Sequence, residues 1–176
     1  MDQLRAELTI GRLALCLAAA LILSACGGAA APAEPYVGLH PTKEAAAQAV
    51  VDALATRDAG RLITLAVSAP EFRKNVWPSL PASNPDVGMP VDYVWSDTDL
   101  KSRGQLAETL AAHGGVPLVV ESVRFAGDTT EYEGFLVHRD SWVTVRDAQG
   151  TRRELRLFGS MIETPAGWKI YSYVVD

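Results

Sequence analysis

The residues best suited to acid–base chemistry are His138 and Asp140, which stand two positions apart. Side chains two positions apart lie on the same face of a β-strand, so an extended chain here would place an imidazole beside a carboxylate. Such a pair can move protons to and from a bound molecule. A solvated or ion-paired strand face, or a bulge at this polar interruption, explains the same residues without catalysis. We therefore treat both as weak catalytic candidates, expect them to be partly exposed, and assign no catalytic residue.

Five aromatic side chains are candidates for lining a ligand pocket, and these are Tyr93, Trp95, Trp142, Trp168 and Tyr171. Aromatic walls are typical of small-molecule sites, but packing in the hydrophobic core explains the same residues. The first two belong to an acidic stretch, residues 92–99, whose carboxylates could stand at a pocket mouth or bind a cation. The stretch lacks the glycine and the closing glutamate of a calcium loop, and a half-buried strand leading into a helix cap also explains it.

Recognisable motifs for metal binding and for cofactor binding are missing from the sequence. The histidines at 40, 113 and 138 lack metal-ligand spacing, and the cysteines at 16 and 26 cannot build a zinc site. Serine nucleophile elbows, phosphate loops, dinucleotide fingerprints and the HExxH pattern are absent as well. We predict neither a metal nor a cofactor.

A small basic cluster is formed by Arg152, Arg153 and Arg156, with Arg146 across a predicted turn. Such a cluster could face anionic lipid headgroups. Acidic residues within the same segment dilute its charge, so a solvated hairpin end is the second interpretation.

The composition indicates one domain of ordinary size. The chain has 176 residues, of which 48% are hydrophobic and 21% charged, values that exclude a disordered chain and a multi-span membrane protein. The formal net charge is −5. Because a non-specific nucleic-acid binder needs a basic surface, we predict no nucleic-acid partner.

The first 26 residues carry the features of a secretory signal. Arg5 and Arg12 precede an apolar run over residues 13–23, shorter than the roughly 20 residues of a spanning helix. The sequence Leu23-Ser24-Ala25-Cys26 follows, and it resembles the lipobox of bacterial lipoproteins. That resemblance implies that the signal is cut before Cys26, that the thiol carries a diacylglycerol, and that the new amino group is often acylated, for example with palmitate. Two or three acyl chains would hold the protein firmly to a membrane.

We therefore predict three segments: a signal peptide (1–25), the lipidated Cys26 with a flexible linker (26–36), and a single domain (37–176). The linker is composed of small residues and proline, and a flexible chain of about this length has a root-mean-square reach near 20 Å. Gly27 follows the cysteine, where an aspartate favours the inner membrane in Gram-negative lipoproteins. In a Gram-negative source the resemblance thus implies the outer membrane, on its periplasmic or surface side.

The N-terminal half of the domain has the patterns of helices. Apolar residues recur at helical spacing over 45–54, and Asp58 can cap a short helix that carries residues 62–66. A third short helix is predicted over 71–77, and the proline-rich residues 78–90 indicate a loop. Alternation predicts a strand over 91–95, and Asp97 or Thr98 can cap a helix that Gly114 and Gly115 end.

The C-terminal half has the patterns of antiparallel strands, predicted over 117–125, 133–146, 154–163 and 168–175. Gly127-Asp128, Asp147–Gly150 and Thr164–Gly167 are the expected turns, and the last of these needs a positive φ at Gly167. Helices that precede a run of hairpin-linked strands indicate an α+β fold.

The order of these elements, together with the ending Gly167-Trp168-Lys169-Ile170-Tyr171-Ser172-Tyr173, resembles the nuclear-transport-factor-2-like, or ketosteroid-isomerase-like, superfamily. The resemblance covers most of residues 41–176 and implies a cone, in which a curved antiparallel sheet wraps a helix layer around a cavity. Because that superfamily includes isomerases, dehydratases, binding proteins and interaction modules, the fold does not give the function.

We predict a lipid-anchored cell-envelope protein whose domain binds an unidentified small molecule or protein without catalysis. One alternative is a small cavity enzyme of the isomerase or dehydratase type, which a closed cavity with a buried aspartate or histidine would favour. Another is an accessory subunit whose sheet docks a partner, which a broad exposed apolar sheet face would favour.

The lipobox resemblance predicts that Cys26 carries lipid. Cells fed labelled fatty acid should incorporate it into the wild-type protein and not into Cys26→Ser, because the serine hydroxyl cannot replace the thiol. Gel fluorography and membrane fractionation measure both. Equal labelling of the two proteins, with Cys26→Ser still in the membrane fraction, would show that the anchor lies elsewhere.

Overall fold

The computed structural model describes residues 36–175. The expected signal peptide (1–25), the lipid site Cys26 and residues 27–35 of the linker lie outside this range. The described residues belong to one compact unit, and both of the hydrophobic clusters described below consist of its residues. This unit therefore carries its own core and is expected to fold by itself. Within residues 36–175, no helix is both long enough and apolar enough to cross a membrane.

Two helices begin where the sequence places their caps. Helix α2 (Lys43–Ala55) starts after Thr42, whose hydroxyl accepts a hydrogen bond from the Ala45 N–H. Helix α3 (Ala59–Leu65) starts after Asp58, whose carboxylate accepts from the Arg61 N–H at 2.8 Å. These caps satisfy N–H groups that have no partner within the helix. Helix α2 buries alanine, valine and leucine side chains against the sheet that contains strand β1.

The predicted helix over 71–77 lies inside a longer run of mixed helical turns. It begins at α4 (Ala69–Glu71), where Ser68 and Glu71 form a reciprocal capping box. The run continues through a π-helical turn and two 3₁₀ turns, which are Phe72–Val76, Trp77–Ser79 and Pro81–Ser83. The proline-rich region thus forms short turns at its start rather than an irregular loop throughout.

Helix α5 (Val91–His113) shows that the predicted strand over 91–95 is wrong, and so is the cap at Asp97 or Thr98. Val91, Val94 and Trp95 also fit the i, i+3, i+4 spacing of a helix, and all three pack against one hydrophobic cluster. Alternation over five residues does not separate the two periods. Gly114 ends the helix as expected. Although α5 has 23 residues, just two of them, Leu106 and Thr109, are buried.

The strands of residues 36–175 form two antiparallel sheets. The first has the order β1-β4-β5, with bounds Leu118–Phe125, Ser141–Asp147 and Arg152–Leu155. The second has the order β2-β3-β6-β7, with bounds Thr129–Tyr132, Phe135–Arg139, Ser160–Thr164 and Gly167–Ser172. Strands in both sheets follow one another through short turns, so the α+β class is confirmed.

Two of the predicted long strands are each divided between the two sheets. The strand expected over 133–146 breaks at Asp140, which has a φ of 56°, and the one over 154–163 breaks between β5 and β6. Strand β2, which the sequence did not predict, precedes the strand expected over 133–146, and Gly134, with a φ of 83°, allows the tight turn between β2 and β3. The Ser141 N–H donates to the Gly159 carbonyl, which keeps the two sheets connected across the break.

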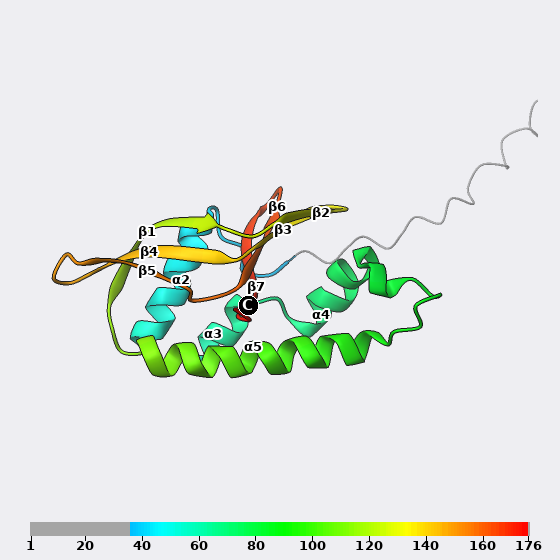
Figure 1. Cartoon of the computed structure of the whole chain (residues 1–176), viewed down its shortest axis with the longest axis horizontal. Coiled ribbons are helices and arrows are strands. Elements are labelled where there is room, and N and C mark those ends of the chain that lie inside the picture. The colour runs from blue at the N-terminus through cyan, green and yellow to red at the C-terminus, as the bar shows by residue number, and fades with distance from the viewer. Residues whose placement is uncertain (1–35, 176) are drawn as a thin grey trace, which may run out of the picture. The chain divides into compact units, whose positions relative to one another are not determined.

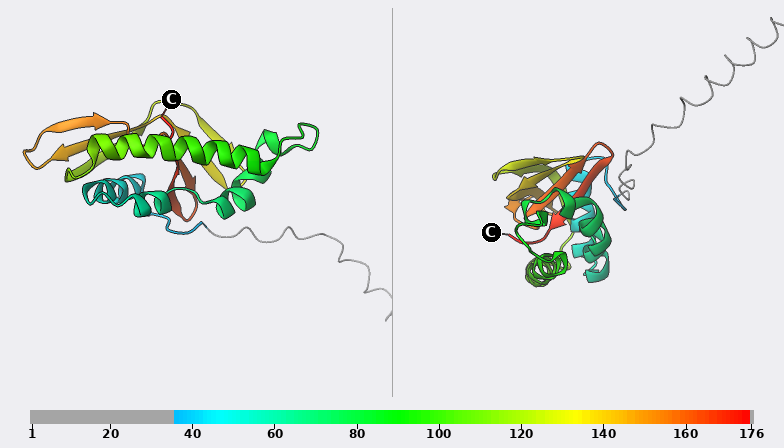
Figure 2. Two further views of the ribbon diagram at one scale, coloured as in Figure 1. Left: turned by 90° about the horizontal axis from the view of Figure 1, so that it is seen from below. Right: turned by 90° about the vertical axis from the view of Figure 1, so that its right-hand side faces the viewer.

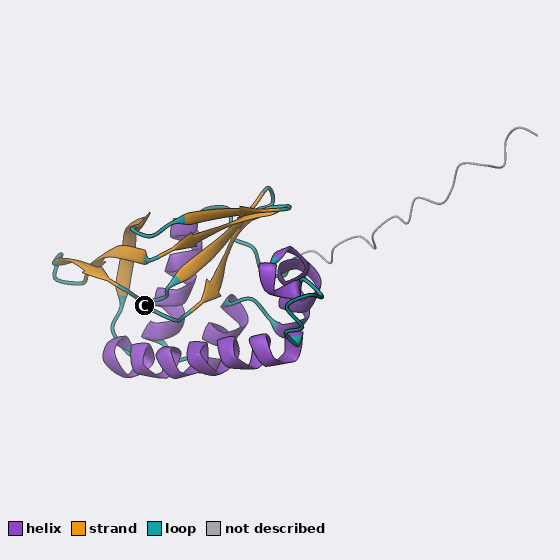
Figure 3. Ribbon diagram, turned by 45° about the vertical axis from the view of Figure 1, so that its right-hand side comes forward, coloured by secondary structure: helices purple, strands orange, loops and turns teal. Residues whose placement is uncertain are grey.

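The helices gather on one side of this bent arrangement of strands (Figure 3). Helix α5 runs along the side of the domain away from β2, β3 and β6, and α3 and β7 lie between them (Figure 1). Seen along its own axis, α5 stands apart from the strands (Figure 2). One hydrophobic cluster joins α2 to both sheets, and a second joins the α4 region to β3, β6 and the start of α5.

The outer edge of β7 is covered by two segments from the N-terminal half. The backbones of His40 and Trp168 exchange hydrogen bonds of 2.8 and 2.7 Å, and the Val67 N–H donates to the Ile170 carbonyl at 2.9 Å. An exposed edge would offer unpaired backbone groups to other chains. Covering it places residues 36–40 and the segment between α3 and α4 beside β7.

The expected positive φ of Gly167 is confirmed at 143°, and Thr164 pairs with Gly167 across a turn of two residues. A second constraint acts at the same place, because a Cβ atom at Gly167 would lie 2.5 Å from the His40 carbonyl oxygen.

Gly167→Val should therefore lower the free energy of unfolding by about 1–3 kcal/mol from backbone strain, with the contact to His40 adding to it. Gly104→Ala is the matched control, since Gly104 lies within α5 with open space around it and should gain helix propensity. Urea denaturation of the two variants measures both changes. An unchanged midpoint for Gly167→Val would contradict the hairpin described above.

Candidate functional site

A cleft of about 670 Å³ lies between α5, β7, residues 37–40 and the chain from Arg61 to Glu71. We call it the α5 cleft. Strand β7 contributes Lys169 and Tyr171, and helix α5 contributes residues that include Trp95 and Leu106. Since α5 buries so few of its side chains, the space between it and β7 is left partly unfilled. The volume is within the range of about 300–1,000 Å³ that is typical of small-molecule sites.

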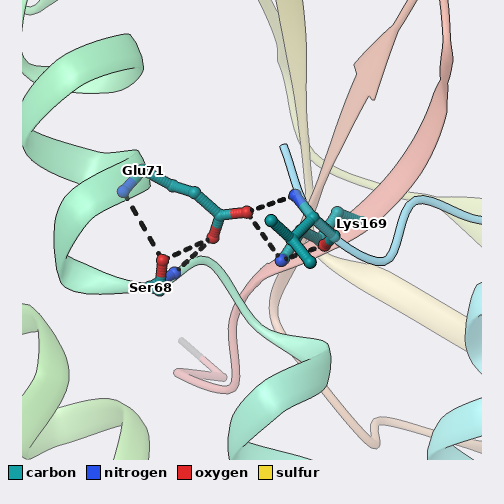
Figure 4. Close-up of polar contacts among 4 residues, drawn as sticks. Ser68, Glu71 and Lys169 are labelled. Atoms are coloured by element: carbon teal, nitrogen blue, oxygen red, sulfur yellow. Dashed lines mark hydrogen bonds and ion pairs between the residues drawn. The ribbon is translucent and has the colours of Figure 1, made fainter. Parts of the chain in front are cut away.

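A buried ion pair forms part of the wall of the α5 cleft. Glu71 and Lys169 are separated by 98 residues, and their side chains are only 6% and 3% exposed. Lys169 Nζ donates to Glu71 Oε1 at 2.9 Å and to the Val37 carbonyl at 2.6 Å. Figure 4 shows the carboxylate of Glu71 between Ser68 and Lys169.

Every acceptor position of the Glu71 carboxylate is used. Oε1 accepts from the Val37 N–H at 2.7 Å as well as from Lys169, and Oε2 accepts from the Ser68 N–H and hydroxyl at 2.7 and 2.8 Å. Burial raises the pKa of Glu71, but the hydrogen bonds from Ser68, Lys169 and Val37 outweigh it, and the pKa lies below its usual value. The ionised Glu71 therefore stabilises the fold at pH values above the pKa that a glutamate has in the unfolded chain, about 4.3. This stabilisation is lost as the pH falls through the lower pKa that Glu71 has in the folded domain.

The imidazole of His40 and the guanidinium of Arg61 also belong to the lining of the α5 cleft. Burial lowers the pKa of His40, and the charges of Arg61 and Lys169 lower it further, so this imidazole is neutral at neutral pH. Arg103, also on the lining, is paired with Asp99 at 2.8 Å.

The tyrosines of the cleft are neutral phenols. Burial, assisted by Tyr132, raises the pKa of Tyr171 to about 12. Burial likewise raises the pKa of Tyr173, whose hydroxyl donates to the Leu62 carbonyl at 2.7 Å. These rings therefore offer apolar faces rather than a base.

The structure separates His138 from Asp140, so the expectation that they share one strand face is wrong. Asp140 lies at the break between β3 and β4 and forms an ion pair with Arg156. His138 stacks between Phe125 and Trp168, and its Nε2 lies 2.7 Å from Glu163 Oε2. The side chain of His138 is 13% exposed and that of Asp140 is 35% exposed, and neither residue lines the α5 cleft. The break in the strand removes the geometry that paired them.

Of the five candidate aromatic residues, Trp95 and Tyr171 line the α5 cleft and three do not. Tyr93 is 67% exposed on α5. Trp142 lies under the guanidinium groups of Arg124 and Arg156, and Trp168 stacks on His138. Periodicity on a presumed strand at 91–95 could not separate Tyr93 from Trp95, which point to different sides of a helix.

Each arginine of the basic cluster has an acidic partner. Arg146 and Arg152 both pair with Glu121, and Arg153 pairs with Asp147. Arg156 pairs with Asp140, as described above. This arrangement favours the interpretation as a solvated hairpin end over a site for lipid headgroups.

The residues that sequence reasoning missed are Glu71, Lys169, His40 and Arg61. The spacing of Ser68 and Glu71 is a capping-box signal visible in the sequence. No local pattern connects Glu71 to a lysine 98 residues away. Within residues 36–175, no three His, Cys, Asp or Glu side chains gather as a metal site requires.

Comparison of the chain with protein-family models, with curated proteins and with solved structures finds no match. The function is therefore inferred from the geometry of the α5 cleft.

Lys169→Met should destabilise the domain by about 3–5 kcal/mol, because it leaves the buried Glu71 carboxylate without its counter-charge. Lys101→Met is the matched control, since Lys101 forms an exposed ion pair with Asp97 on α5 and should change stability by less than about 1 kcal/mol. Thermal unfolding followed by circular dichroism compares the two, with a loss of about 10–17 °C expected for Lys169→Met. Equal melting midpoints for the two variants would contradict a stabilising role of the ion pair.

Proposed function

We propose that this chain is a lipid-anchored cell-envelope protein whose domain binds a small molecule in the α5 cleft without chemically changing it. The observation that carries the proposal is the cleft itself, a space of about 670 Å³ with aromatic and aliphatic walls beside a buried ion pair. Apolar walls with a few placed polar groups are typical of ligand sites.

The chemistry of the cleft supports binding over catalysis. A general base needs an acceptor position for the proton, and the Glu71 carboxylate has all of its positions occupied. His40 is the one imidazole on the lining, and its charged neighbours are Arg61 and Lys169 rather than a carboxylate that would orient it. An isomerase or dehydratase would require such a paired group.

The architecture supports a cone-like fold of the nuclear-transport-factor-2-like kind. Helices precede a bent antiparallel arrangement of strands, and a cleft lies between α5 and β7. Exposed large apolar side chains within residues 36–175 are scattered over several elements, and of the sheets' strands β1 carries one, Val119. This distribution favours a ligand cleft over a broad sheet surface that docks a partner.

The buried ion pair fixes the start of the described domain beside the α5 cleft. Glu71 and Lys169 hold both backbone groups of Val37, which stands eleven residues after Cys26 in the sequence and lines the α5 cleft. With a lipid on Cys26, the cleft would lie within reach of the bilayer surface, because the composition of this segment predicts a flexible linker and a flexible chain of eleven residues spans roughly 18 Å on average.

Filling the cleft should abolish binding. The domain of residues 33–176 should bind phenylnaphthylamine, an uncharged fluorescent dye, at one site, and Thr98→Trp should remove this binding because Thr98 faces the cleft from α5. Ser96→Trp is the matched control, since Ser96 lies on the same helix, is exposed and does not line the cleft. Dye fluorescence under direct excitation measures the binding.

Circular dichroism establishes that both variants remain folded. Equal dye binding by Thr98→Trp and Ser96→Trp, or no binding by the wild-type domain, would contradict the α5 cleft as a ligand site.

A further inference from the structure

The charges on the lining of the α5 cleft cancel, except for one. Five charged residues line it, and these are Arg61, Glu71, Asp99, Arg103 and Lys169. Glu71 pairs with Lys169 at 2.9 Å, and Asp99 pairs with Arg103 at 2.8 Å. The guanidinium of Arg61 makes neither a hydrogen bond nor an ion pair with the part of the chain that the structure describes. The lining therefore carries one uncompensated positive charge.

Arg61 is placed at the rim of the cleft, where a charged group of a ligand would remain close to water. Arg61 is exposed, and its backbone is fixed in the first turn of α3, where the Arg61 N–H donates to the Asp58 carboxylate at 2.8 Å. A guanidinium presents several donors in one plane, a shape that fits the oxygens of a carboxylate, sulfonate or phosphate. The free guanidinium thus offers a ready site for an acidic group.

His40 stands close enough to Arg61 for their charges to interact, and it lines the same cleft. Its backbone is fixed to Trp168 by two hydrogen bonds. As a neutral imidazole it can donate one N–H without adding a second charge. With Arg61 as the one unpaired charge on the lining, the cleft suits an acidic group that carries a single negative charge, and His40 lies on the same lining.

The rest of the cleft is apolar. Trp95, Leu106 and Tyr171 line it from α5 and β7, and Leu106 is only 5% exposed. Ile63, on the same helix as Arg61, is 39% exposed and also lines the cleft. An apolar body would be buried against these side chains while the acidic group remained at the rim.

We infer that the α5 cleft takes an amphiphile with one acidic group, held by Arg61 at the rim with its apolar body along Trp95, Leu106 and Tyr171. This inference rests on the proposed function, since it names the class of ligand for the same cleft. The shared chemistry is an acidic group on an apolar body, which a fatty acid from the bilayer and a soluble aromatic acid both have.

Two dyes with the same rings test the role of the charge. Anilinonaphthalene sulfonate carries an acidic group, and phenylnaphthylamine lacks it. The wild-type domain of residues 33–176 should bind the sulfonate roughly tenfold more tightly than the neutral dye, the effect expected of one charge-assisted hydrogen bond. Arg61→Gln should remove that preference and leave the affinity for the neutral dye unchanged.

Arg152→Gln is the matched control, because it removes the same charge from an exposed arginine that pairs with Glu121 and lies outside the cleft. It should retain the full preference for the sulfonate. Displacement of the bound sulfonate by dodecanoate and by naphthoate then distinguishes a chain-shaped ligand from a ring-shaped one.

The outcomes separate the two proposals. An equal preference for the sulfonate in wild type and Arg61→Gln would overturn the inference about Arg61, and so would an equal affinity of the wild type for both dyes. In either case, loss of neutral-dye binding in Thr98→Trp would still support the cleft as a ligand site. Failure of the wild-type domain to bind either dye would overturn the proposed function and the inference together.

Discussion

The ion pair between Glu71 and Lys169 is the interaction on which the rest of the structure depends. Removing two charges from water costs several kcal/mol for each ion, and only full hydrogen bonding offsets that penalty. Glu71 satisfies this condition with contacts to Ser68, Lys169 and the backbone of Val37. One carboxylate thereby joins the N-terminal segment, helix α4 and strand β7, and these three segments form a wall of the α5 cleft.

The cleft exists because α5 is held at a few points along its length. Leu106 and Thr109 are its buried residues, Trp95 packs on Phe72, and Ser102 accepts a hydrogen bond from the Tyr173 N–H. Between these contacts the helix leaves space next to β7. The walls of this space are mostly apolar, and their charges are paired apart from that of one arginine at the rim. Such a surface suits retention of a ligand rather than proton transfer.

The bend in the strands separates His138 from Asp140, the two catalytic candidates of the sequence. Asp140 adopts a positive φ, and the chain passes from one sheet to the other at this residue. His138 is consequently packed in an aromatic stack with Phe125 and Trp168, and Asp140 is bound to Arg156. The sequence also allowed a bulge at this polar interruption, but the structure has a break between two strands at Asp140 instead.

The sequence by itself determined what depends on neighbouring residues. Caps such as Thr42 and Asp58 place helix starts, and the turn before Gly167 places the last hairpin, because their hydrogen bonds and φ values involve residues within a few positions. Tertiary structure decided the rest. Whether residues 91–95 form a strand or a helix depends on the cluster they pack against, and the partner of Glu71 lies 98 residues away. Contacts at such a distance in the chain arise from the arrangement of whole elements, which local patterns do not encode.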